Sequence, residues 1–170
     1  MKMPYLKGDG DLFFNATSAK IFLKSQKMAN KVSAVALQKK FKKFENRIKK
    51  NTLKILKILK KERISVDVYL ADNKTMKFLN KKFRNKNKSA NVLSFIEPKN
   101  FISSPIAKRS SGKKIGEIYL NMEQKDKLIS KEFLIAHGIL HLLGYDHIRK
   151  SDAIKMEVKE KSVSKKLKIF

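Results

Sequence analysis

The chain contains no cysteine and no tryptophan among its 170 residues, and it has only three prolines and six glycines. Without cysteine it forms neither a disulfide framework nor a thiolate metal site, and it suits a reducing compartment. No apolar run approaches the roughly 18 residues that a membrane helix needs, and the N-terminus lacks the apolar core of a signal peptide. These absences predict a soluble cytoplasmic protein without a membrane partner.

Acidic residues are also scarce. The chain has 15 of them and 41 lysines and arginines, which gives a net charge of +26. Such a surface attracts polyanions, and nucleic acid is the first candidate. Only five of the basic residues are arginines. A lysine-rich composition also arises from an AT-rich genome, so the charge supports proximity to nucleic acid and predicts nothing about base sequence.

Hydrophobic periodicity predicts interspersed strands and helices, with no internal repeat or linker. Alternating residues indicate strands at 64–70, 92–95 and 115–120, and a loop over 97–114. Spacing of three and four indicates a long amphipathic helix, or two joined helices, over 34–60. Further helices are expected after the N-caps Asp72, Ser130 and Ser151, the second ending near Gly144. Residues 1–30 give mixed signals, and one mixed sheet covered by helices is the simplest architecture.

The three histidines of the chain, His137, His141 and His147, lie within eleven residues. A separation of four places the first two on one helical face, and a turn at Gly144 can return the third to the same point. Three neutral imidazoles suit Zn²⁺ and leave a fourth position open, as in catalytic sites. Histidines with ordinary hydrogen bonds are the alternative. Since the helix is apolar almost all round, we expect a metal site, which nickel, iron or manganese could also occupy.

The residue after the first histidine separates this site from the helical zinc proteases. Their motif is HExxH, and its extended form HExxHxxGxxH has the ligand spacing found here. Position 138 is glycine in this chain, so the glutamate that serves those proteases as general base is missing. The spacing therefore predicts the metal ligands of a zinc protease without its peptide-cleaving chemistry.

The segment 137–147, with sequence HGILHLLGYDH, resembles the signature of the YbeY family of bacterial endoribonucleases. Three other segments resemble family blocks and occur in the family's order. They are Leu79-Asn80 with Phe83-Arg84, the sequence NVLSF at 91–95, and the sequence IGEI at 115–118. The resemblance covers roughly residues 60–160.

This resemblance implies an α+β fold over residues 1–170, in which residues 1–30 form a variable segment. It implies a mixed, mostly parallel four-stranded sheet, about five or six helices and a metal-binding helix like that of the zincins. It also implies a zinc-dependent, single-strand-specific endoribonuclease with one zinc ion per chain. Such an enzyme matures ribosomal RNA, notably the 3′ end of the small-subunit RNA, and serves ribosome quality control. Its partners would be the small ribosomal subunit and ribosome-associated proteins, and not DNA.

The resemblance also assigns catalytic residues. It makes His137, His141 and His147 the metal ligands and places Arg84 in the cleft that faces the metal. There a guanidinium can grip a phosphate and neutralise charge in the transition state, although composition alone would make Arg84 one more solvated cation. The lysines expected to contact RNA beside it are Lys82, Lys86 and Lys88.

Some chemistry is left open by the sequence. Glu117, Asp146 and the ribose 2′-hydroxyl are all candidates for the general base, and Asp146 could instead orient a ligand. Two other functions are compatible with the residues. One is a non-catalytic RNA-binding factor for ribosome assembly with a structural metal, and the other is a metal-dependent hydrolase of peptides or small molecules.

Overall fold

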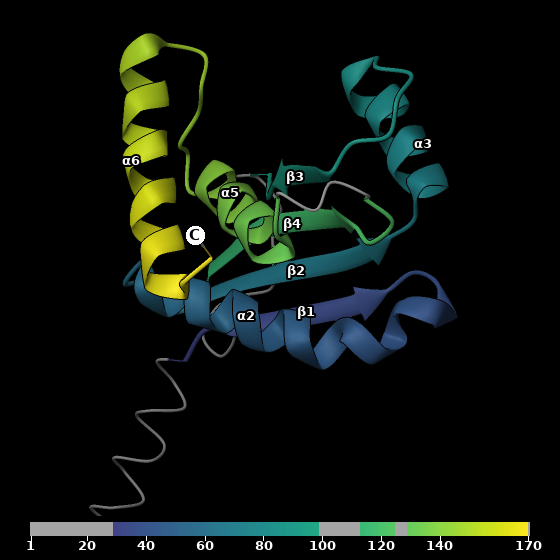
Figure 1. Ribbon diagram of the computed structural model, residues 1–170, viewed down its shortest axis with the longest axis horizontal. Coiled ribbons are helices and arrows are strands. Elements are labelled where there is room, and N and C mark those ends of the chain that lie inside the picture. The colour runs from purple at the N-terminus through teal and green to yellow at the C-terminus, as the bar shows by residue number, and fades with distance from the viewer. Residues whose placement is uncertain (1–28, 99–112, 125–128, 170) are drawn as a thin grey trace, which may run out of the picture.

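The computed structural model describes residues 29–98, 113–124 and 129–169. These residues form a four-stranded sheet in the order β1-β2-β4-β3 (Figure 1). The strands are β1 (Lys31–Ala36), β2 (Ile64–Ala71), β3 (Val92–Ile96) and β4 (Lys113–Asn121). β1 and β4 both run parallel to β2, whereas β3 is antiparallel to β4. The predicted mixed, mostly parallel sheet is thereby confirmed.

Four α-helices and one 3-10 helix lie in the described residues, where the family resemblance implied about five or six helices for the whole chain. They are η1 (Lys39–Phe44), α2 (Glu45–Ile58), α3 (Asn73–Arg84), α5 (Lys131–Leu142) and α6 (Lys150–Leu167). α2 and α5 pack on one face of the sheet, and α6 packs against both of them. Figure 1 shows α6 and α3 at opposite ends of the sheet. Among the described residues, no helix is long and apolar enough to cross a bilayer.

The alternation along β2 creates two different faces. Val66, Val68 and Leu70 are fully buried and join the main core beneath α2 and α5. Asp67 and Tyr69 point to the opposite face, and the Tyr69 ring stacks on the Tyr119 ring of β4 at 4.8 Å between centroids. One-sided burial of this kind fixes the register, because a slip by one residue would exchange the two faces.

The predicted helix over 34–60 is wrong at its start. Residues up to Ala36 form β1, which pairs in parallel with β2, and only then do η1 and α2 follow as two joined helices. In β1 the side chain of Val32 is buried while Lys31 and Ser33 are exposed, which is the two-residue period of a strand. Pairing with β2 outweighs the helical preference of the two alanines in this segment.

Helix starts were predicted with mixed success. Asp72 caps α3 by accepting a hydrogen bond from the Thr75 backbone N–H at 2.8 Å, as expected. Ser151 does not cap α6, because the helix begins two residues earlier than predicted, at Lys150, and its N-cap, Arg149, makes no side-chain capping bond. Strand β4 also begins earlier than predicted, at Lys113. The rest of the expected loop, at 99–112, and residues 1–28 lie outside the described residues.

Candidate metal centre

Helix α5 carries the first two histidines and is fixed by its surroundings. At its start, the Ser130 hydroxyl accepts a hydrogen bond from the Phe133 backbone N–H at 3.0 Å, as the sequence predicted. At its end, Gly144 has a φ of 90°, in the left-handed region that favours glycine. The side chains that anchor α5 in the core are Leu134, Ile135, Ala136, Ile139 and Leu142. A buried helix of this kind holds its remaining face rigidly.

The three imidazoles converge as the spacing predicted. The Nε2 atoms of His137 and His141 lie 3.1 Å apart. His147 follows the turn after α5, and its ring centroid lies 5.3 Å from that of His137 and 5.4 Å from that of His141. One nitrogen of each ring lies within 4.8 Å of the others, and these three residues could hold a metal ion.

Hydrogen bonds behind two of the rings indicate which nitrogen carries the proton when the ring is neutral. The Nδ1 atom of His141 lies 3.0 Å from the Tyr145 carbonyl oxygen, which can only accept, so this nitrogen carries the proton. The Nδ1 atom of His137 lies 2.6 Å from a Glu160 carboxylate oxygen and donates to it. In the neutral rings both Nε2 atoms are then unprotonated, and two lone pairs face each other across 3.1 Å.

Two facing lone pairs repel each other unless a proton or a metal ion lies between them, and the chemistry of this donor set fits zinc. Zinc–nitrogen bonds of about 2.0–2.1 Å in a tetrahedral site separate two ligand nitrogens by roughly 3.3 Å, close to the observed spacing. Metal-bound histidines commonly donate their second N–H to a carboxylate or a backbone carbonyl, which is the arrangement here. The residues present therefore fit a three-histidine metal site.

Burial also favours the ligand form of His141. It lowers the pKa of this imidazole below its ordinary value, and the neighbouring His137 acts in the same direction. The hydrogen bond to Tyr145 opposes them. A lowered pKa keeps the ring neutral, and a neutral ring is the form that binds a metal.

Glu160 is a residue of this centre that no sequence pattern indicated. It lies on α6, 23 residues beyond His137, among many other charged side chains. Its exposed fraction of 13% is low for a glutamate, whereas Glu157 on the same helix is 59% exposed. No local pattern distinguishes the two in sequence, since only the packing of α6 on α5 brings Glu160 to the histidine.

Gly138 lies where helix α5 approaches the sheet. A Cβ atom at this position would lie 2.9 Å from the Ser94 Oγ atom and 3.1 Å from the Ile118 Cδ1 atom. A longer side chain here would have to displace both neighbours. The structure thus gives a packing reason for the missing glutamate of the zinc proteases.

A cavity of about 840 Å³ brings Arg84 and the histidines together. Its walls are residues 83–84 at the end of α3, 92–96 of β3, 137 and 141 of α5, and 144–148 of the following turn. Arg84 reaches this cavity although 53 positions separate it from His137 in the sequence. Asp146 also lines it, with its carboxylate accepting a hydrogen bond from the His147 backbone N–H at 2.7 Å.

Other predicted site residues lie elsewhere. Lys82, Lys86 and Lys88 are exposed near the end of α3 but do not line the cavity. Glu117 lies on the face of the sheet away from α5, where its carboxylate contacts the Lys114 ammonium at 3.3 Å and the Tyr119 hydroxyl at 3.3 Å. This position removes Glu117 from the candidates for a general base in the cavity.

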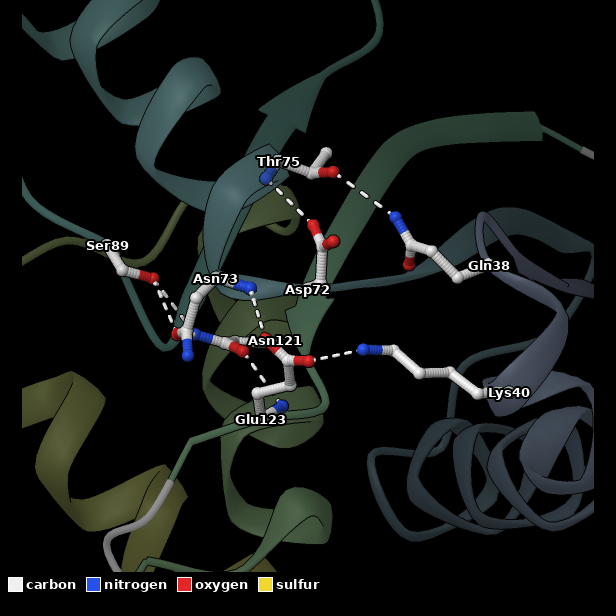
Figure 2. A network of polar contacts seen from close by, with 8 residues as sticks. All are labelled: Gln38, Lys40, Asp72, Asn73, Thr75, Ser89, Asn121 and Glu123. Atoms are coloured by element: carbon white, nitrogen blue, oxygen red, sulfur yellow. Dashed lines mark hydrogen bonds and ion pairs between the residues drawn. The ribbon is translucent and has the colours of Figure 1, made fainter.

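A polar network anchors the helix that carries Arg84 (Figure 2). Asn121, buried at the end of β4, donates from Nδ2 to Asn73 Oδ1 at 2.8 Å and to Ser89 Oγ at 3.0 Å. The Glu123 carboxylate accepts from the Asn73 backbone N–H at 3.0 Å and forms an ion pair with Lys40. These bonds tie the first turn of α3 and the segment before β3 to the end of β4. They fix one end of α3, while Arg84 lies at the other.

Comparisons with known proteins point to one family. The family model described as endoribonuclease YbeY matches residues 26–168. A protein named endoribonuclease YbeY from Pelagibacter ubique is 39% identical over 142 residues, covering 76% of this chain and 86% of its own. Its namesake from Clostridium botulinum, strain Langeland, is 30% identical over 141 residues, covering 63% of this chain and 80% of its own.

One further curated protein and one solved structure also match this chain. A Mycoplasma mobile protein of the same name is 33% identical over 118 residues, covering 62% of this chain and 73% of its own. A Thermotoga maritima protein with a solution structure is 22% identical, covers 81% of this chain and 91% of its own, and superposes with a TM-score of 0.43. The family match spans most of the chain and includes both Arg84 and the three histidines, so the chain belongs to the YbeY family of endoribonucleases.

Proposed function

We propose that this protein is a zinc-dependent endoribonuclease that cleaves single-stranded RNA in the cavity between α3 and the end of α5. One observation carries the proposal: three imidazoles with convergent nitrogens and one guanidinium line the same cavity. The relatives are named endoribonucleases, and this name supplies the reaction class. The net charge of +26 supports a polyanionic substrate.

Each residue of the cavity has a distinct task in this proposal. His137, His141 and His147 hold the zinc ion, and Glu160 and the Tyr145 carbonyl orient two of the rings. Arg84 binds the phosphodiester through its planar guanidinium and neutralises charge that develops there. Bound zinc would supply a Lewis acid that polarises a phosphate oxygen or lowers the pKa of a water molecule. Asp146 and the ribose 2′-hydroxyl remain as candidates for the general base.

We further propose a cellular role in the cytoplasm, with the whole chain 1–170 acting as one domain. The enzyme would trim ribosomal RNA, notably the 3′ end of the small-subunit RNA, and serve ribosome quality control beside ribosome-associated proteins. The family membership and the absence of a membrane-spanning helix in the described residues support this placement. The exposed lysines Lys82, Lys86 and Lys88 would add phosphate contacts outside the cavity.

The test compares Arg84→Ala with Arg47→Ala, a matched loss of one arginine on α2. Arg84→Ala should keep one zinc ion per chain yet lower the cleavage rate of single-stranded RNA by roughly 10²–10³-fold, as removal of a charge-stabilising donor does elsewhere. Arg84→Lys keeps the charge without the bidentate geometry, and we expect an intermediate rate. Arg47→Ala should cleave at the normal rate, and equal rates for the two alanine variants would contradict the role of Arg84.

The same variants distinguish the other functions. In cells that depend on this protein, Arg84→Ala should leave small-subunit RNA with unprocessed 3′ ends, and correct ends would remove the maturation role. Tight RNA binding without cleavage by zinc-loaded wild-type protein would identify a non-catalytic assembly factor. Turnover of peptides without turnover of RNA would identify a different hydrolase.

A further inference from the structure

Phe83 is an aromatic side chain at the mouth of the candidate site that the proposed chemistry does not use. It precedes Arg84, lines the same cavity, and is 56% exposed. Two more exposed apolar residues line this cavity, Ile96 at 62% and Ile148 at 85%. A cavity rimmed by exposed apolar side chains beside a cation indicates a ligand that is partly flat and apolar and partly anionic.

Other aromatic side chains pack against the Phe83 ring. Its centroid lies 5.0 Å from that of Phe95 in an edge-to-face contact, and Phe95 lies 5.6 Å from Tyr119 in the same geometry. Tyr119 in turn stacks on Tyr69. This row of rings runs from the middle of the sheet to the cavity, so Phe83 is supported by strands β3, β4 and β2. A ring fixed in this way loses little conformational entropy when a ligand stacks on it.

Unpaired nucleobases are the ligands that fit such a ring. Every base has a π-face that stacks on an aromatic side chain, and bases are available for this only when they are not stacked within a duplex. Arg84 is next in the chain and binds phosphate, which every nucleotide carries. The Lys82 ammonium, 5.5 Å from the Phe83 centroid, adds positive charge on the same helix.

We infer that Phe83 is a stacking platform for one unpaired base of the RNA. The base stacks on this ring while Arg84 binds a phosphate of the same strand. This inference rests on the proposed endoribonuclease function and gives a physical reason for a preference for single strands. Phe83 acts through binding and positioning. Its loss should therefore lower the apparent affinity for RNA, while the metal centre is unaffected.

The chain offers a matched control in Phe78. It lies on the same helix, is 60% exposed, and has the Lys82 ammonium 5.9 Å from its ring. It differs from Phe83 in that it does not line the cavity. A general effect of removing an exposed phenylalanine from α3 would appear in both variants, whereas loss of a stacking platform would appear only at position 83.

The experiment measures kcat/KM and KM of the zinc-loaded protein on a single-stranded RNA oligonucleotide, and on copies with one abasic position each. For the wild type, one abasic position should lower kcat/KM roughly ten-fold, as loss of one stacked base does. Phe83→Leu should show the same loss of kcat/KM on the intact RNA, mainly through a raised KM. The abasic position in the RNA should cause no further loss in this variant. Phe83→Trp should restore the wild-type values, and Phe78→Leu should match them throughout.

Several results would overturn the platform. They include a normal kcat/KM for Phe83→Leu, and a loss at the abasic position that is the same in Phe83→Leu and the wild type. If the wild type is a dimer, Phe83→Leu is a monomer, and the RNA kinetics are unchanged, the ring belongs to a contact between two copies of the chain. If the wild type cleaves no RNA, the proposed function fails, and anisotropy with the same oligonucleotides then tests the platform alone. Equal binding of the intact and all abasic strands would overturn it.

Discussion

At the scale of single residues, the tautomers of His137 and His141 decide which ring nitrogens can bind a metal. The Tyr145 carbonyl and the Glu160 carboxylate each accept a hydrogen bond from the Nδ1–H group of one ring, and in the neutral rings this leaves both Nε2 atoms free to bind a metal. A carboxylate behind a ligand also raises the basicity of the imidazole. Glu160 is therefore a positioning residue, which acts on the metal through His137.

The first prediction concerns Glu160→Gln, which retains an oxygen acceptor but removes the negative charge. We expect zinc affinity to fall by about 10-fold or more, in the range measured for residues behind metal ligands. Competition with a chromogenic chelator measures it. Glu157→Gln is the matched control, because Glu157 lies on the same helix and pairs with Lys161. Equal zinc affinities for the two variants would show that Glu160 does not support the metal centre.

The metal ligands could be predicted from the sequence, whereas the groups that hydrogen-bond to them could not, for a physical reason. His137 and His141 are four positions apart on one helix, so helix geometry alone brings them together. The Tyr145 carbonyl is a backbone atom, and Glu160 meets His137 only after α6 packs on α5. Only the family resemblance assigned Arg84 to the site, because no local pattern links two residues that are 53 positions apart in the sequence.

At the scale of elements, α3 determines where Phe83 and Arg84 lie, and its first turn is capped by Asp72. Hydrogen bonds from the side chain and then the backbone of Thr75 hold the pKa of the Asp72 carboxyl below its ordinary value of 3.8. The cap therefore contributes its full stability above about pH 4. Its contribution is lost as the pH falls below that value, toward the lowered pKa of the folded state.

The second prediction follows from this cap. Asp72→Ala should lower the free energy of unfolding by about 1 kcal/mol near neutral pH, as loss of an N-cap usually does. The difference between the variant and the wild type should shrink as the pH falls from 4 toward 2. Urea denaturation across this pH range measures both effects.

The control is Ser151, which the sequence predicted as an N-cap and which does not cap α6. Ser151 makes no capping bond, so Ser151→Ala should change the free energy of unfolding by less than about 0.5 kcal/mol at any pH. A loss at Ser151 as large as that at Asp72 would contradict the observed start of α6. A pH-independent loss at Asp72 would show that its carboxylate does not stabilise the helix.

Hydrophobic periodicity predicted the elements that bury one regular face. It failed where hydrogen bonding between strands determines the conformation of the segment. Strand β2 alternates cleanly between Val66, Val68 and Leu70 on one face and Asp67 and Tyr69 on the other, and it was predicted correctly. In β1 the inward positions after Val32 are alanines, which do not distinguish a strand from a helix. Its strand conformation depends on hydrogen bonds to β2, which no local pattern shows.

At the scale of the whole molecule, the net charge of +26 favours any nucleic acid, and specificity has to come from the cavity. The third prediction separates these contributions by salt dependence. RNA affinity should fall steeply with salt, and Arg84→Ala should reduce the slope of log K against log salt by about 0.7, the value for one phosphate contact on a single strand. Fluorescence anisotropy measures it.

The control for the salt measurement is again Arg47→Ala on α2, whose slope should equal that of the wild type. The comparison holds the loss of one charge constant and changes only its position. An affinity that does not depend on salt would contradict phosphate binding as the source of RNA affinity. An equal change of slope in both variants would place the phosphate contacts on the general surface, and not at the cavity.

The central claim is that the three histidines and Arg84 form one metal-dependent site for RNA cleavage. Its most direct test is the rate at which a single-stranded RNA is cleaved as zinc is returned stepwise to metal-free wild-type protein. We predict no cleavage without metal and a rate that rises in proportion to zinc and levels off at one ion per chain, with His147→Ala inactive throughout. Full cleavage by the metal-free protein, or by His147→Ala, would contradict the claim.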